Sequence, residues 1–125
     1  MSPLPEAATD AELVALVDRW VGLLEQGDYE AANELIPPDE GRWAPNRVRW
    51  AIEGSGGRAT VAGESRGLPQ RRVVDRWEAA DGSDAVGEIW YDLNIDGVAS
   101  DLTATFWLVR VQGGQVVRLK DIHVM

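Results

Sequence analysis

The only histidine of the chain stands two residues after a carboxylate, in a segment of alternating apolar and polar residues. Asp121 and His123 belong to the segment 116–124, whose period predicts a β-strand, so both side chains should share one face of a sheet. Val117 and Leu119 fall on that face, which makes it the buried one. An imidazole oriented by a carboxylate suits general base catalysis. The same pair can equally be a hydrogen-bonded element that fixes the core, and both interpretations stay open.

Two further polar side chains are expected on this face. Tyr91 or Arg76 would stabilise negative charge that develops in a reaction. Arg76 can pair with Asp121 across the gap at Gly87, or it can simply reach the sheet edge and solvent. A metal site is not expected, because Asp121 and His123 supply at most two ligands and the chain has no cysteine and no second histidine. We likewise expect no cofactor.

Composition and charge disfavour several classes of protein. The 125 residues suit one domain, 1–125. The formal net charge of -9 disfavours binding to nucleic acid or to an anionic membrane surface. No apolar run approaches the roughly 20 residues that span a bilayer, and the amino-terminal residues lack the pattern of a secretion signal. We therefore expect a cytoplasmic protein that binds neither nucleic acid nor membrane.

The first third of the chain has helical spacing. It predicts three helices, over about 10–26, 28–36 and 45–52. Thr9 followed by Glu12 has the spacing of a capping box, which marks the start of the first helix. These helices should each bury one apolar stripe.

Two segments carry weaker patterns. Residues 1–8 are predicted to be a disordered amino terminus. Residues 54–70, rich in glycine and arginine, are predicted to form a mobile loop, with a functional lid as the alternative. We also expect one short strand within 58–68.

After residue 70 the period becomes that of a strand. The predicted strands span 71–79, 85–95, 98–111 and 115–124. Turn dipeptides join them at Asp81-Gly82, Asp96-Gly97 and Gly113-Gly114. Two-residue turns would place Ile95 opposite Val98 and would make Asp92 and Asp101 cross-strand neighbours. Every strand side chain is thereby assigned to a face.

One face is mostly aliphatic and should receive the helices. It is expected to line a small apolar cavity, together with aromatic side chains from the helical half. Trp43 lies in a loop, where an aromatic side chain tends to cover a pocket or a partner. The candidate ligand-binding residues are Tyr91, Arg76, Trp43, Phe106 and Trp20.

The opposite face carries Trp77, Trp90 and Trp107. Soluble monomers seldom leave so much aromatic surface in water. We therefore expect this face to contact a second subunit, in a C2 homodimer packed sheet to sheet.

Three amino-terminal helices followed by a curved antiparallel sheet resemble the NTF2-like superfamily, the cone-shaped α+β fold also called SnoaL-like. The segments 89–93, 100–106 and 121–125 are similar to those of an uncharacterised family of small bacterial proteins. The resemblance implies an α+β fold in which three helices pack on a curved four- to five-stranded antiparallel sheet around a cavity. The superfamily contains isomerases, dehydratases, epoxide hydrolases, cyclases and interaction domains, so the fold does not determine the function.

Three functions are compatible with these patterns. The first is a non-catalytic binding or protein-interaction domain that holds a small apolar ligand or contacts a protein, and we favour it because catalytic groups are few. The second is a cofactor-independent isomerase, dehydratase or hydrolase with His123 as the base and Asp121 as the orienting group or acid. The third is an immunity-type protein that neutralises a toxin, which its small size and acidity would suit.

Overall fold

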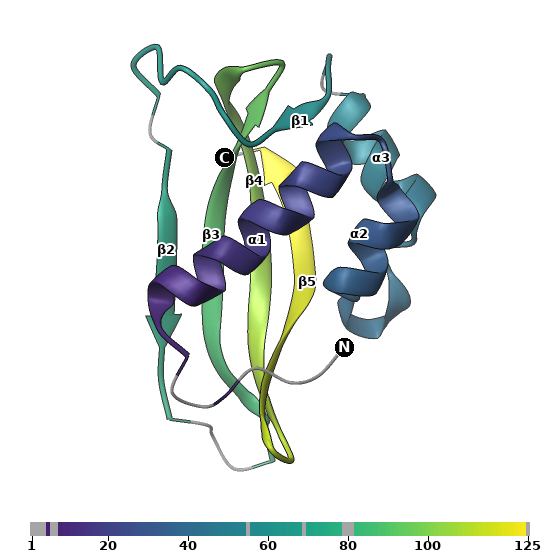
Figure 1. Ribbon diagram of the computed structural model, residues 1–125. Coiled ribbons are helices and arrows are strands. Elements are labelled where there is room, and N and C mark those ends of the chain that lie inside the picture. Colours follow the sequence, from purple (N-terminus) through teal and green to yellow (C-terminus); the bar gives the residue numbers. More distant parts are fainter. Residues whose placement is uncertain (1–4, 6–7, 55, 69, 79–81, 125) are drawn as a thin grey trace.

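The computed structural model describes residue 5 and residues 8–54, 56–68, 70–78 and 82–124. Within this part of the chain, three α-helices precede five strands of one antiparallel sheet (Figure 1). The predicted α+β class, with the helices before the strands, is confirmed. Most of the predicted disordered segment 1–8 lies outside the described residues.

The helices begin and end where local signals place them. They are α1 (Asp10–Glu25), α2 (Tyr29–Leu35) and α3 (Pro45–Glu53), with a short 3-10 helix, η1 (Asp39–Gly41), between α2 and α3. Thr9 and Glu12 form the predicted capping box at the start of α1. The Asp28 side chain accepts a hydrogen bond from Ala31 N and so caps α2. α1 lies across the sheet in Figure 1, with α2 and α3 to one side.

The strands are β1 (Ala59–Thr60), β2 (Arg72–Arg76), β3 (Ala85–Ile95), β4 (Val98–Val111) and β5 (Gly114–Val124). β1 falls within the predicted 58–68 range. β4 pairs with one edge of β3, while β1 and β2 pair with β3 at different heights, and β5 pairs with β4. Asp96 and Gly97 form the β3–β4 turn, both with positive φ, which a type I′ turn requires.

The helices and the sheet enclose one continuous core on the face that we call the inner face. Trp20 of α1 packs edge to face on Phe106 of β4, with ring centroids 5.2 Å apart, and both side chains are fully buried. Tyr91 of β3 is buried beside them and donates a hydrogen bond to Asp18 of α1. Three side chains that were predicted to line a cavity are therefore packed core residues.

A β-bulge in β5 changes the face of its last residues. Phe106 pairs with Leu119, but the next residue of β4, Thr105, pairs with Asp121, so Lys120 is the extra residue. Because strand side chains alternate, the extra residue sends every later side chain to the opposite face. Ile122 accordingly enters the core.

Asp121 and His123 lie on the other face, which we call the outer face. The expectation that they face the helices is wrong, and the bulge at Lys120 is the physical reason. His123 pairs with Thr103 rather than with an inner-face residue.

The β3–β4 register also shifts, between Asp92 and Asn94. Asp92 pairs with Thr103, so the predicted Asp92–Asp101 neighbours are wrong. The pairing of β3 with β4 shifts by two residues here, so the side chains of both strands stay on the faces that alternation predicts. The β4–β5 turn lies at 112–113, one residue earlier than predicted.

Candidate functional site

The outer face of the sheet gathers aromatic and charged side chains from four strands. Three successive rows cross it from β2 through β3 and β4 to β5. They read Asp75, Glu88, Trp107, Arg118, then Val73, Trp90, Thr105, Asp121, then Arg71, Asp92, Thr103, His123. Two of the three predicted dimer-face tryptophans stand in these rows, and Trp77 directly follows β2, two residues after Asp75. The three tryptophans share the outer face, as the alternation predicted.

Asp92 is the best-bound group of this face, with only 4% of its side chain exposed. Its Oδ2 accepts hydrogen bonds from Arg71 N at 2.8 Å and from Arg71 Nε at 2.9 Å. Its Oδ1 accepts from Arg71 Nη2 at 3.1 Å and from Thr103 Oγ1 at 2.8 Å. Burial raises the pKa of Asp92, but the hydrogen bonds from Arg71 and Thr103 outweigh it and hold that pKa below its usual value. The carboxylate is therefore ionised and fixed in place.

Trp90 occupies the middle of the outer face. The Arg71 guanidinium lies 5.6 Å from the centre of its ring, within the range of a cation–π contact. The His123 ring lies nearly perpendicular to it, with 6.3 Å between the two ring centroids. A pocket of about 230 Å³ lies beside it, lined by Arg71, Val73, Asp75 and Trp90. The pocket therefore combines the aromatic Trp90 ring and the aliphatic Val73 side chain with one cationic and one anionic side chain, Arg71 and Asp75.

Lys120 joins two neighbouring side chains of the first row. Its Nζ lies 2.6 Å from Glu88 Oε2 and 4.4 Å from the centre of the Trp107 ring. Trp107 in turn meets Trp77 edge to face at 6.4 Å, and Trp77 Nε1 donates to Ala85 O at 3.0 Å. Lys120 therefore contacts Trp107 directly, and Trp107 in turn contacts Trp77.

The Asp121–His123 pair lies at the end of the outer face formed by β5. His123 Nδ1 is 3.1 Å from Asp121 Oδ2, with the two side chains 34% and 44% exposed. The contact is not a hydrogen bond, and Nδ1 has no hydrogen-bond partner among the described residues. The two groups are thus a close polar contact rather than an oriented dyad. Neither of them lines the pocket beside Trp90, and their catalytic role stays a prediction.

Arg76 takes a different partner from the one considered in the sequence. Its Nε and Nη2 donate to Asp10 Oδ1 and Ala8 O at 3.1 and 2.8 Å, which ties β2 to the start of α1. The predicted Arg76–Asp121 pair is wrong, because Asp121 lies on the outer face and Arg76 on the inner one. The alternative, that Arg76 reaches the sheet edge and solvent, is confirmed in part: β2 is an edge strand and the Arg76 side chain is 37% exposed, although it also pairs with Asp10.

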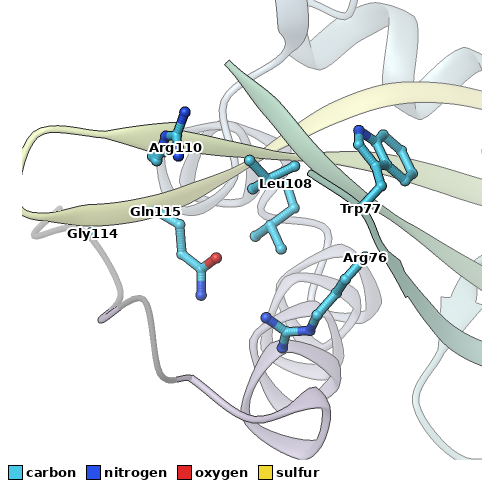
Figure 2. A pocket seen from close by; sticks show the side chains of 7 residues that line it. Arg76, Trp77, Leu108, Arg110, Gly114 and Gln115 are labelled. Carbon is cyan, nitrogen blue, oxygen red and sulfur yellow. The ribbon is translucent and has the colours of Figure 1, made fainter. Parts of the chain in front are cut away.

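A second pocket of about 230 Å³ opens beside Arg76, near the β4–β5 turn. Figure 2 shows Arg76 from β2 and Gln115 from β5 pointing into the same space, with Leu108 between them. Gln115 Nε2 donates to Pro5 O at 2.9 Å. The polar groups of this pocket therefore hold the amino-terminal segment against the sheet.

Trp43 is buried rather than exposed in its loop. Its Nε1 donates to Lys120 O at 3.2 Å, so it packs against the bulged part of β5. The Arg72 guanidinium lies 3.8 Å from the centre of the Tyr91 ring. Burial, followed by the hydrogen bond to Asp18, raises the pKa of Tyr91. Trp43 and Tyr91 both serve the packing of the inner face.

Sequence reasoning missed the groups that bind one another on the outer face. They are Arg71, Glu88, Asp92, Thr103 and Lys120. One signal was present, because Glu88, Trp90 and Asp92 alternate along a single strand and must share a face. Their partners come from other strands, and no local pattern identifies them.

No family model, curated protein or solved structure matches the chain. Among the residues that the structure describes, no three His, Asp or Glu side chains are grouped so that they could hold a metal ion. None of the described helices is long and apolar enough to cross a membrane. Function is therefore inferred from the geometry of the outer face.

Proposed function

We propose that this chain is a non-catalytic protein-interaction domain that binds its partner through the outer face of the sheet. The observation that carries the proposal is the gathering of Trp77, Trp90 and Trp107 on the sheet face away from the helices. Trp77 is 43% exposed and the other two are partly exposed. Tryptophan and arginine are the side chains that most often dominate binding energy at protein interfaces.

The polar contacts of the outer face hold these tryptophans in position before any partner binds. Arg71 is fixed by Asp92 and lies over Trp90, while Lys120 is fixed by Glu88 and lies over Trp107. A side chain that is already ordered loses little entropy when it is buried by a partner. Rigid strands with clamped aromatic side chains therefore favour recognition of a protein surface.

The packed inner face supports a protein partner over a small apolar ligand. Trp20 and Phe106, which were expected to line a ligand cavity, are fully buried and pack on each other. An immunity-type role would be one form of this function, with a toxin as the partner.

Photo-crosslinking tests the proposal in cells that produce the protein natively. A photoreactive p-benzoylphenylalanine replaces Val73 on the outer face in one variant and Val61 in the control. Both valines are 42% exposed, and Val61 lies beside α1. We expect a covalent adduct from position 73, identified by mass spectrometry of the crosslinked peptides, and none from position 61. Equal labelling, or no adduct from position 73, would refute the proposal.

A pair of tryptophan variants provides an independent measurement on the same partner. Trp77→Ala should weaken its binding by about tenfold or more, as expected for an interface tryptophan that contributes strongly to binding. Trp50→Ala on α3 removes a side chain that is 74% exposed, more than Trp77, and should leave binding unchanged.

A further inference from the structure

We infer that the outer face binds a second copy of this chain, with Asp75 of each copy facing Arg118 of the other. This inference rests on the interaction face proposed above and names its partner. It is drawn from the charges at the two ends of one row of side chains.

The row runs Asp75, Glu88, Trp107, Arg118, one side chain from each of four adjacent strands. The two middle residues are already engaged by the Lys120 ammonium. The two end residues have opposite charges, and neither side chain has a hydrogen-bond or ion-pair partner within the described ranges. The row therefore offers one unpaired carboxylate and one unpaired guanidinium.

A two-fold axis parallel to the strands, passing between Glu88 and Trp107, exchanges the two ends of this row. Asp75 of one copy then lies over Arg118 of the other, and symmetry repeats the pair. Four strands place the ends about 14 Å apart, and packed sheets lie about 10 Å from each other. An extended arginine and an aspartate together span that separation.

The alternative axis, perpendicular to the strands along the same row, is disfavoured by charge. It would place each Asp75 over the other Asp75, and each Arg118 over the other Arg118. Like charges that face each other across an interface oppose association. The charge pattern of the row thus selects the axis parallel to the strands.

The next row toward the β4–β5 turn is consistent with the same two-fold axis. Trp77 stands at its β2 end, and Val116, which pairs with Val109, stands at its β5 end. The two-fold rotation exchanges these two ends, so that Val116 of the second copy covers the exposed Trp77 ring. Apolar contact and ion pairs are then both satisfied.

The overall charge of the chain also favours this face for self-association. The chain carries a formal net charge of -9, so two copies repel each other in most orientations. The three rows and Lys120 are nearly balanced, with the cations Arg71, Arg118 and Lys120 against the carboxylates Asp75, Glu88, Asp92 and Asp121. Two outer faces can therefore meet without the repulsion that the acidic helices impose.

Charge reversal tests the inference on the purified full chain. The variants are Asp75→Arg, Arg118→Asp and the double variant. Glu34→Arg, at an exposed residue of α2, is the control with the same charge change as Asp75→Arg. Sedimentation velocity over a concentration series should give a wild-type species of twice the 13.7 kDa chain mass. Each single reversal should raise the dissociation constant about tenfold or more, and the double variant should return it close to the wild-type value. Circular dichroism verifies that each variant is folded.

The failures of the two proposals can be told apart. A wild-type dimer whose affinity none of the outer-face reversals changes, or single reversals that the double variant does not rescue, would overturn the Asp75–Arg118 pairing. If the wild type is monomeric and position 73 forms an adduct with a different protein, the proposal that the partner is a second copy is wrong. The proposal that the outer face is an interaction surface is then still supported. A monomeric wild type without any position-73 adduct would overturn both.

Discussion

The Lys120 ammonium lies 2.6 Å from the Glu88 carboxylate, and Lys120 is the extra residue of the bulge in β5. The contact links a local irregularity of one strand to a strand more than thirty residues earlier. Removal of Lys120 therefore affects both the charge balance of the outer face and the tryptophan beneath the ammonium.

Lys120→Met should lower the free energy of unfolding by about 1–3 kcal/mol, because it leaves the Glu88 carboxylate nearly buried without its cation. Urea unfolding at pH 7 measures the change. The control is Arg66→Met, which removes an ion pair to Glu64 whose two side chains are 66% and 75% exposed, and it should change stability by less than about 0.5 kcal/mol. Equal losses in the two variants would contradict the role assigned to Lys120.

Asp92→Asn should cost about 2–4 kcal/mol at pH 7, since it weakens the charge-assisted bonds from Arg71 and Thr103. The folded-state pKa of Asp92 lies below its usual value, so its stabilisation is complete above the unfolded pKa, about 3.9. It is lost as the pH falls through the folded pKa. The difference between wild type and variant, measured by urea unfolding from pH 7 to pH 2.5, should therefore shrink only at the acid end. A constant difference would show that the charge is not responsible.

The two tyrosines should make the fold sensitive to alkali. Burial, followed by the hydrogen bond to Glu53, raises the pKa of Tyr29 to about 12, and the pKa of Tyr91 is also raised. The unfolded chain loses these protons near pH 10 and the folded chain does so later. This stabilisation is thus complete below pH 10, and it is lost as the pH rises through the pKa values of the two tyrosines in the folded protein. Tyr91→Phe and Tyr29→Phe should each flatten the fall in unfolding free energy between about pH 10 and 11.

Tyrosinate absorbance at 295 nm gives a direct measurement of the same effect. The unfolded chain in urea should titrate near pH 10, and the folded chain should titrate later. Coincident titration curves would contradict the hydrogen bonds of Tyr29 to Glu53 and of Tyr91 to Asp18.

Deletion of Lys120 should leave the protein folded, because it removes the extra residue and turns the bulge into regular pairing. Leu119 still pairs with Phe106 and Asp121 with Thr105, so Ile122 stays in the core and Asp121 and His123 stay on the outer face. The deletion and Lys120→Gly both remove the ammonium that contacts Glu88, and each should lose about 1–3 kcal/mol of unfolding free energy. Circular dichroism and urea unfolding measure both variants. An unfolded deletion variant would show that the bulge itself is required for the fold.

Much of this fold follows from local patterns in the sequence. The capping box at Thr9 and Glu12, the proline that starts α3 and the turn at Asp96-Gly97 all act within a few residues, so their effects are visible without the rest of the chain. Alternation along β3 likewise placed Glu88, Trp90 and Asp92 on one face.

The face of Asp121 and His123 was decided only by tertiary structure. A bulge places one extra residue in a strand and so moves the later side chains to the other face. Its position depends on which contacts the extra side chain can make. Lys120 finds Glu88 and Trp107 on neighbouring strands, while Ile122 gains a place in the core. Those partners lie far away in the sequence, so the period of β5 predicts that Asp121 and His123 share a face but cannot determine which face it is.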